Sequence, residues 1–386
     1  MHCRHYFFTA VAIKSILKNN GVETFSCVAL MAILMLFPIM EVPLFIGYAN
    51  ISILLPVSVI WIMLLNLNKA ELQPKRLALI SALSIFSVFQ ARTAAYMIVG
   101  CFFGYALYVI VSSFSEKTLR QDFFILCKKF FCIGLFAVLM MSPLFFSFLK
   151  HAVTYDIGSA YSAYAMGQDF FNRFISHFEG IGLLIYGIFF VGILAGLKNK
   201  NLRTYAVFLC VWIISSVFLF CRIQFMGWQH YCIMILPFAV VLTSFAAIFY
   251  SKQKMLGLSF IAILAFNFTQ TFFPILTNET ARLFNYGFKT PVRYDIEDVK
   301  NFVGDLNKLT ENSDKKIFLL ASGGLYNSTT LQKIYVPERH EAIPSLLNTN
   351  DVDLRDGFPM QLFDADFVVI AEPIQVHLRR EDHRLS

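Results

Sequence analysis

Long apolar runs follow one another through the first 275 residues of this chain of 386, and they limit what it can fold into. The hydrocarbon core of a bilayer is roughly 30 Å thick, and a helix of about 20 apolar residues crosses it. Hydrophobic residues make up 57% of the sequence and charged residues 15%, a composition that a water-soluble domain cannot keep away from solvent. We therefore predict a mainly α-helical membrane protein with about nine transmembrane helices, at residues 25–40, 51–67, 77–90, 93–114, 130–148, 179–196, 204–222, 231–250 and 255–275.

Basic residues gather in every second connection between these runs. By the positive-inside rule those connections and the N-terminus are cytoplasmic, and the count of nine then places everything after residue 275 outside. Residues 1–275 hold 19 Lys and Arg against 8 Asp and Glu, whereas residues 276–386 hold 13 against 17. The basic excess therefore belongs to the membrane part, where it reports on topology, and it does not indicate a nucleic-acid partner.

The patterns divide the chain into three regions. The apolar patch "YFFTAVAI" near the start is interrupted by Lys14 and has no small-residue cleavage site after it, which is typical of an interfacial helix and not of a signal peptide. We place that N-terminal helix at residues 1–24, a polytopic transmembrane domain at 25–275, and a small extracytoplasmic α/β domain at 276–386.

The last region has the periodicities of both helix and strand. The stretches "KKIFLLAS" and "DFVVIAE" predict two buried strands. In "IEDVKNFVGDLNKL" the helical period places four apolar residues on one face, Val299, Phe302, Val303 and Leu306.

Cationic and aromatic side chains occur at two predicted outer ends of spans. Arg92 lies in the tight corner "FQART", and Arg222 and His230 lie at the equivalent depth in "FCRIQFMGWQHYCIMILP". Together they could form a cationic, aromatic-rimmed pocket for an anionic lipid headgroup, with Trp228 and Tyr231 at the interface. Trp228 and Gln229 are also candidate ligands of the sugar or the acceptor. In the alternative, the arginines reach out to lipid phosphates and Trp228 belongs to an aromatic belt.

The predicted outer loop from Lys150 to Glu179 interleaves acids with tyrosines. Carboxylates hold sugar hydroxyls and aromatic faces stack on pyranose rings, so this loop suits a sugar-binding surface. Asp156 is also a candidate general base for a hydroxyl or amine nucleophile. The alternative is an ordinary solvated loop. The candidate residues are Tyr155, Asp156, Tyr161, Tyr164 and Asp169.

Glu41 is a further candidate base, because it follows the first span and an acid at a membrane boundary is costly unless it faces water or a partner. The sequence "ISHFE" lacks the HExxH spacing, and no His, Cys and acid cluster has the spacing of metal ligands. We predict no metal site built by the protein, and a divalent cation is left open. The eight cysteines show no CxxC spacing and lie mostly within apolar runs, as small buried residues do.

The helix pair "RLALISALSIFSVFQARTAAYMIVG", the later span end "RIQFMGWQHYCIMILP" and the tail strand "FDADFVVIAEP" occur here in one layout. This layout resembles the GT-C type membrane glycosyltransferases, most closely the bacterial relatives of protein mannosyltransferases and of the lipid A aminoarabinose transferase. The resemblance implies a polyprenyl-phosphate sugar donor, a lipid, glycan or protein acceptor, and transfer on the outer face of the bacterial inner membrane. It also implies that Arg92 and Arg222 bind the donor phosphate with His230 as auxiliary.

The N-terminal part departs from the family pattern. The stretch from Asn19 to Val59 looks like the third and fourth spans of the family, which implies that the first two spans and the acidic catalytic loop are missing. Either the chain is truncated at its start, or it is a divergent relative with its base elsewhere. The functions that stay open beside a glycosyltransferase are a transporter, a polysaccharide polymerase or flippase, and a catalytically inactive relative.

Overall fold

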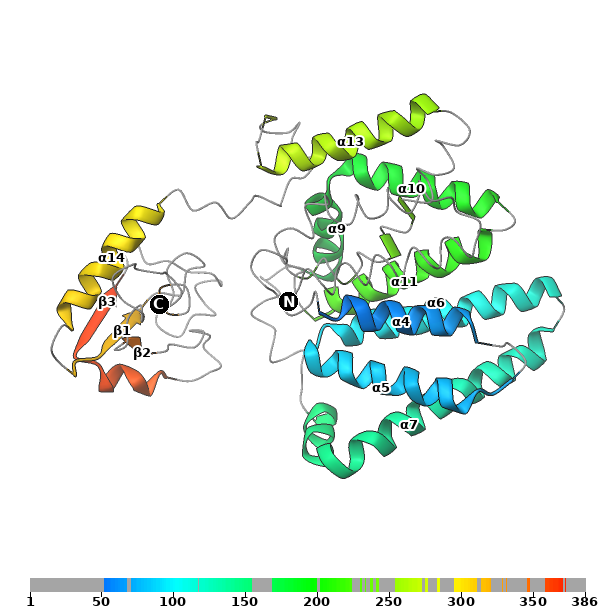
Figure 1. The fold of residues 1–386 in the computed structure, drawn as a ribbon, viewed down its shortest axis with the longest axis horizontal. Helices are drawn as coiled ribbons and strands as arrows, with labels where there is room; N and C mark the ends of the chain where they lie inside the picture. Colours follow the sequence, from blue (N-terminus) through cyan, green and yellow to red (C-terminus); the bar gives the residue numbers. More distant parts are fainter. Residues whose placement is uncertain are drawn as a thin grey trace. The chain divides into compact units, whose positions relative to one another are not determined.

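The computed structural model describes most of the helical part of the chain and the core of the C-terminal region (Figure 1). The chain divides into two compact units, the first made of Met1–Tyr155 and Asp169–Thr290 and the second of Asp156–Gln168 and Pro291–Ser386, and each is described by itself. The described residues are 52–67, 71–116, 118–154, 169–199, 202–223, 254–272, 295–310, 314–320 and 358–370, with short pieces at 230, 233, 237–238, 241–242, 275–276, 283–284, 328, 331, 346–347 and 372.

The described residues of the first unit are almost entirely helical. Three of its helices are long and apolar enough to cross a membrane, over Ala94–Phe114, Leu119–Ser142 and Arg203–Cys221, and the predicted count of nine spans stays a prediction. The helices are α4 (Leu54–Leu65), α5 (Pro74–Gln90), α6 (Ala94–Glu116), α7 (Leu119–Thr154), α9 (Phe170–Ile181), α10 (Leu183–Lys198), α11 (Arg203–Cys221) and α13 (Lys254–Phe272).

The helices α6 and α11 pack against each other in opposite directions at the centre of this unit. Close approach is possible because α6 has glycine at residue 104, where a Cβ atom would lie 2.7 Å from the carbonyl oxygen of Phe208. Small residues bring the backbones of membrane helices together, which increases their dispersion contacts. The contacts run in reverse order along the two helices, Tyr96 with Phe220, Gly104 with Phe208, and Tyr108 with Tyr205.

Helix α7 begins earlier than the sequence predicts. Residues up to Lys129 were expected in a cytoplasmic connection before the span at 130–148, but the helix runs unbroken from Leu119 for 36 residues. Asp122 in its first turn is buried and accepts hydrogen bonds from the hydroxyls of Ser113 and Thr118. An acid near a helix N-terminus is stabilised by the helix dipole. The buried Asp122 therefore favours a helix α7 that begins directly after α6, in place of the extended connection that the sequence predicts.

The second unit is a small α/β fold. Its three described strands, β1 (Ile317–Leu320), β2 (Leu346–Leu347) and β3 (Phe367–Ile370), form a parallel sheet in the order β2-β1-β3. The short 3-10 helix η6 (Met360–Asp364) precedes β3. Strands β1 and β3 lie where the sequence predicts them, but only β1 is buried as predicted. In β3 the alternate residues Val368 and Ile370 are exposed, because only the face with Phe367 and Val369 packs against the core. The third strand, β2, has only two residues and gives no periodic signal of its own.

Helix α14 (Ile296–Leu309) covers one face of this sheet with the residues that its sequence predicts. Val299, Val303 and Leu306 are buried, and Phe302 packs at the edge of the same core. The exposed side of α14 is charged, with ion pairs between Lys300 and Glu297 at 2.7 Å and between Lys308 and Asp305 at 2.9 Å. The remaining core residues are Ile317, Leu319, Leu331 and Leu346.

Candidate functional site

The antiparallel packing of α6 on α11 brings two predicted site residues to the same end of the pair. Arg92 lies in the turn directly before α6 begins, and Arg222 is the residue that follows the last turn of α11. The contacts between Tyr96 and Phe220 join these two helix ends, with ring centroids 5.2 Å apart. Both arginine side chains are exposed, so a ligand at this end of the helix pair can meet two guanidinium groups.

The predicted tight corner between α5 and α6 is confirmed. Helix α5 ends at Gln90, and a short series of backbone hydrogen bonds leads into α6, with the Ala94 N–H donating to the Ala91 carbonyl at 2.9 Å. The Arg92 carbonyl accepts from the Ala95 N–H at 3.1 Å, which fixes the backbone of Arg92 in the corner while its side chain stays exposed. Beside it, the Oε1 atom of Gln90 is buried and has no hydrogen-bond partner within the described part of the chain.

A third arginine, Arg173, belongs to the same end of the unit and was not predicted. It lies on α9, and only 9% of its surface is exposed. Its backbone carbonyl accepts a hydrogen bond from the thiol of Cys221 at 3.8 Å, directly before Arg222 in the chain. Phe170 and Phe218 make an edge contact with ring centroids 5.0 Å apart. The start of α9 is thus fixed against the end of α11.

Asp169 caps α9. Its Oδ1 atom accepts the backbone N–H of Asn172 at 2.7 Å, and its Oδ2 atom accepts from the Asn172 side-chain amide at 3.3 Å. A carboxylate in this place satisfies a free N–H group of the first turn and complements the helix dipole. This helix could have been predicted, because in "DFFNRF" an Asp is followed by apolar residues at helical spacing, which signals a helix start. Such a prediction would have placed Arg173 in the first turns of a helix and made it a candidate.

The side chain of His230 contacts the last turn of α11. The imidazole packs on Phe220 with ring centroids 4.8 Å apart. Burial lowers the pKa of His230 to about 4, because a charged ring loses its hydration in an apolar environment. At neutral pH the ring is therefore uncharged, and it adds hydrogen-bonding capacity to this end without adding positive charge.

The other predicted site residues fall outside the described residues. Within the part of the chain that the structure describes, no group of three or more His, Cys, Asp and Glu side chains could hold a metal ion. The divalent cation thus stays an open prediction. The residues that fall outside are Glu41, Tyr155, Asp156, Tyr161, Tyr164, Trp228 and Gln229.

The site therefore consists of two exposed arginines at the ends of α6 and α11, a neutral histidine, and a buried arginine on the helix that packs beside them. A cationic surface at the end of apolar helices attracts a lipid-linked anion, because the charged headgroup and the apolar tail meet matching environments. No protein-family model, curated protein or solved structure matches the chain.

Proposed function

We propose that this chain is a membrane glycosyltransferase that moves a sugar from a polyprenyl-phosphate-linked donor to a lipid, glycan or protein acceptor of the cell envelope. The observation that supports the proposal is the position of Arg92 and Arg222 at the same end of the antiparallel α6–α11 pair. A prenyl chain fits the apolar surroundings of these helices, and its phosphate fits the two guanidinium groups at their ends.

The two arginines would act on the leaving group. A phosphate that links lipid to sugar carries one negative charge, and it gains a second when the bond between the anomeric carbon and the phosphate oxygen breaks. A guanidinium group can donate two parallel hydrogen bonds to phosphate oxygens, and its positive charge stabilises this developing negative charge. The dipole of α6, whose positive end lies behind Arg92, acts in the same direction.

The acceptor would attack the anomeric carbon from the face opposite the phosphate, so that the configuration inverts. Its hydroxyl or amine proton passes to a carboxylate, for which Glu41 and Asp156 are the candidates. The new bond to the acceptor forms as polyprenyl phosphate leaves, and no further reactant is needed.

A binding experiment with the full chain in lipid nanodiscs tests the proposal. Arg92→Ala and Arg222→Ala should each weaken binding of a polyprenyl-phosphate sugar by about tenfold or more, since a hydrogen bond to a charged group contributes about 1.5–3 kcal/mol. Arg203→Ala is the matched control, because Arg203 is also exposed but lies at the opposite end of α11, with its Nε atom 2.8 Å from the Leu197 carbonyl. Unchanged binding in both Arg92→Ala and Arg222→Ala would overturn the proposal.

Two further measurements separate the alternatives. Transfer of a labelled sugar to an acceptor distinguishes a glycosyltransferase from a transporter, a flippase or an inactive relative, all of which can bind the donor without transfer. Reporter fusions after Arg76 and after residue 280 should report the inside and the outside respectively. The reverse pattern would place the arginine pair on the cytoplasmic side and contradict transfer on the outer face.

A further inference from the structure

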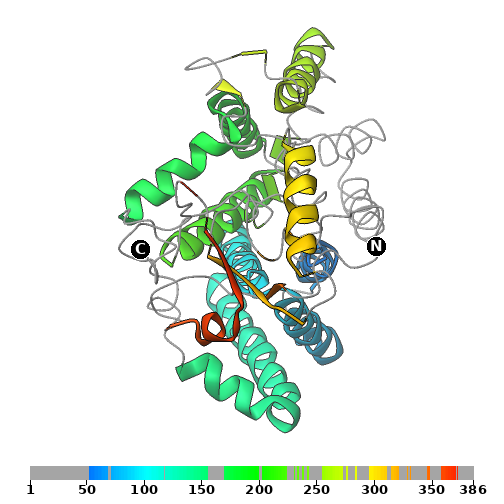
Figure 2. The ribbon, with the colours of Figure 1, turned by 90° about the vertical axis from the view of Figure 1, so that its left-hand side faces the viewer.

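Helix α9 turns away from α10 at a single residue. Gly182 has a φ of +102°, and a Cβ atom there would lie 1.8 Å from the carbonyl oxygen of Phe284. Glycine is thus required both by the backbone angle and by the close approach. As a result α9 lies across the direction of α10 and does not continue it (Figures 1 and 2).

The inward side of α9 is held by the membrane unit. Phe170 and Phe174 pack against its core, and their rings stack with centroids 6.0 Å apart. Arg173, the charged residue in the first turn and a half, also lies on this side, with its Nε atom 3.3 Å from the Asp169 carbonyl. The charge of this segment is therefore directed inward, which is unusual for a helix at a protein surface.

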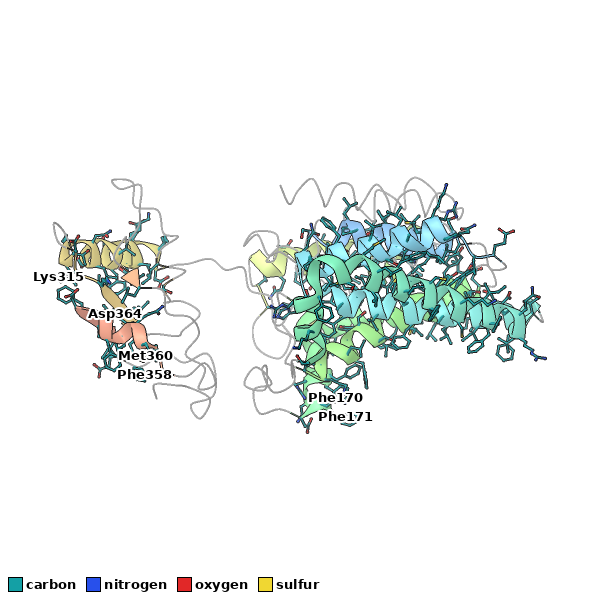
Figure 3. All side chains as sticks on the ribbon, turned by 90° about the horizontal axis from the view of Figure 1, so that it is seen from below. Phe170, Phe171, Lys315, Phe358, Met360 and Asp364 are labelled. Carbon is teal, nitrogen blue, oxygen red and sulfur yellow. The ribbon has the colours of Figure 1, made fainter. Side chains whose placement is uncertain are left out.

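Among the described side chains of α9, which end at Ile175, the outward side carries no charge. Phe171 is 72% exposed and Ile175 is 55% exposed, and these two residues are four apart, on one face of the helix. Figure 3 shows Phe171 beside Phe170 at the start of α9. Helix α14 of the second unit differs from α9 in this respect. It too has one buried face, but its exposed face carries ion pairs.

The exposed apolar side of α9 also continues into the exposed apolar side of a spanning helix. Phe218, in the last turn of α11, is 42% exposed, and Ile214 one turn earlier is 51% exposed. The ring of Phe218 contacts that of Phe170, which in turn contacts the ring of the exposed Phe171 with centroids 5.6 Å apart. A spanning helix exposes such residues to acyl chains. Since α9 is fixed to the last turn of α11, its outward side lies at the level where that apolar helix ends.

We propose that α9 is an interfacial helix whose Phe171 and Ile175 side chains insert into the bilayer beside the end of α11. The occupant of this face is the acyl-chain and headgroup boundary of the lipid, because its described side chains are apolar and continue into the exposed apolar side of α11. In this position the helix fixes the depth at which the unit sits in the membrane. The inference depends on the membrane-spanning role of α11 and not on the donor or the reaction.

Photo-crosslinking in the full chain tests the inference. The photoreactive residue benzoylphenylalanine replaces Phe171 or Ile175, and each variant is reconstituted into nanodiscs of phosphatidylethanolamine and phosphatidylglycerol and then illuminated. The expected result is a mass increase of one phospholipid per chain, with the adduct on an acyl chain. The same substitution at Phe218 is the positive control. Leu309 on α14, which is 50% exposed on a charged helix face, is the matched control that should give no lipid adduct.

Three outcomes would overturn the inference. Lipid adducts at Phe218 but at neither position of α9 would show that this face is not in the bilayer. Crosslinks from Phe171 and Ile175 to a peptide of the same chain, or to a second copy of it, would show that protein covers the face. Absence of lipid adducts at Phe218 as well would contradict the spanning role of α11, and the inference would fall with it, whereas donor binding in the same samples would still report on the proposed function.

Discussion

The indole nitrogen of Trp212 donates a hydrogen bond to the backbone carbonyl oxygen of Met97, 2.9 Å away, and so joins α11 to the first turn of α6. Trp61 packs edge-on against Trp212 with ring centroids 5.6 Å apart and is buried to a similar degree. Its Nε1 atom, however, finds no acceptor among the described residues. The two tryptophans therefore differ in one hydrogen bond and little else.

We expect Trp212→Phe to destabilise the membrane unit more than Trp61→Phe. Both substitutions remove the same indole volume, but only the first breaks a hydrogen bond, whose net contribution is about 0.5–1.5 kcal/mol. Thermal unfolding of both variants in the same detergent measures the difference. Equal losses of stability would mean that the bond to Met97 contributes nothing.

Gly104→Ala should lower the stability of the unit by about 1–3 kcal/mol, the usual cost of overpacking. The added methyl group would meet both the backbone and the ring of Phe208, with its nearest neighbour at 2.7 Å, so α6 and α11 must move apart. Gly134→Ala on α7 is the matched control, because nothing lies within 4 Å of the position of its Cβ atom. Equal melting temperatures of the two alanine variants would show that the close approach at Gly104 does not limit the packing of α6 on α11.

Asp169→Ala should cost about 0.5–2 kcal/mol, as the loss of an N-cap does, whereas Asp169→Asn should cost little because the amide oxygen still accepts the Asn172 N–H. The same pair of variants separates capping from sugar binding. If the carboxylate itself binds a sugar, Asp169→Asn will reduce transfer while the melting temperature stays the same. A cap role would be excluded if the asparagine variant lost as much stability as the alanine variant.

Acid should destabilise the protein partly through His230. Its folded-state pKa of about 4 lies below the unfolded value of about 6.5, so only the unfolded state takes up the proton between these values. The contribution of His230 to stability is therefore complete above pH 6.5 and decreases as the pH falls towards 4. Melting temperatures measured across this range should fall less steeply in His230→Gln than in the native chain. Parallel curves would contradict the burial of a neutral ring.

Several local elements of the fold could be predicted from the sequence. The apolar runs before and after "FQART" give α5, α6 and the corner between them, and the face of α14 follows from residues such as Val299 and Val303. The stretches "IFLL" and "FVVI" give strands β1 and β3. In each case the signal is local, because it depends on side chains that are neighbours along one helix turn or one strand.

In helices α7 and α9 the prediction from local sequence pattern was wrong or incomplete. Lys129 was expected in a connection because a charge in a membrane span is costly, but it lies on α7 with 2% of its surface exposed, seven residues after the buried Asp122. Asp169 was read only as a sugar ligand, although it also begins a helix. A carboxylate or an ammonium group has several stable environments, and the sequence does not say which neighbour the fold will supply.

The sequence by itself determined that this chain is rich in apolar helices, that Arg92 and Arg222 lie at helix ends, and that a small α/β unit follows. Only the tertiary structure decided that these two arginines share one end of one helix pair and that Arg173 lies beside them. The physical reason is that α6 and α11 are apolar on every side, so their periodicity names no partner. Their pairing depends on the close approach at Gly104 and on the hydrogen bond from Trp212, which exist only when both helices are in place.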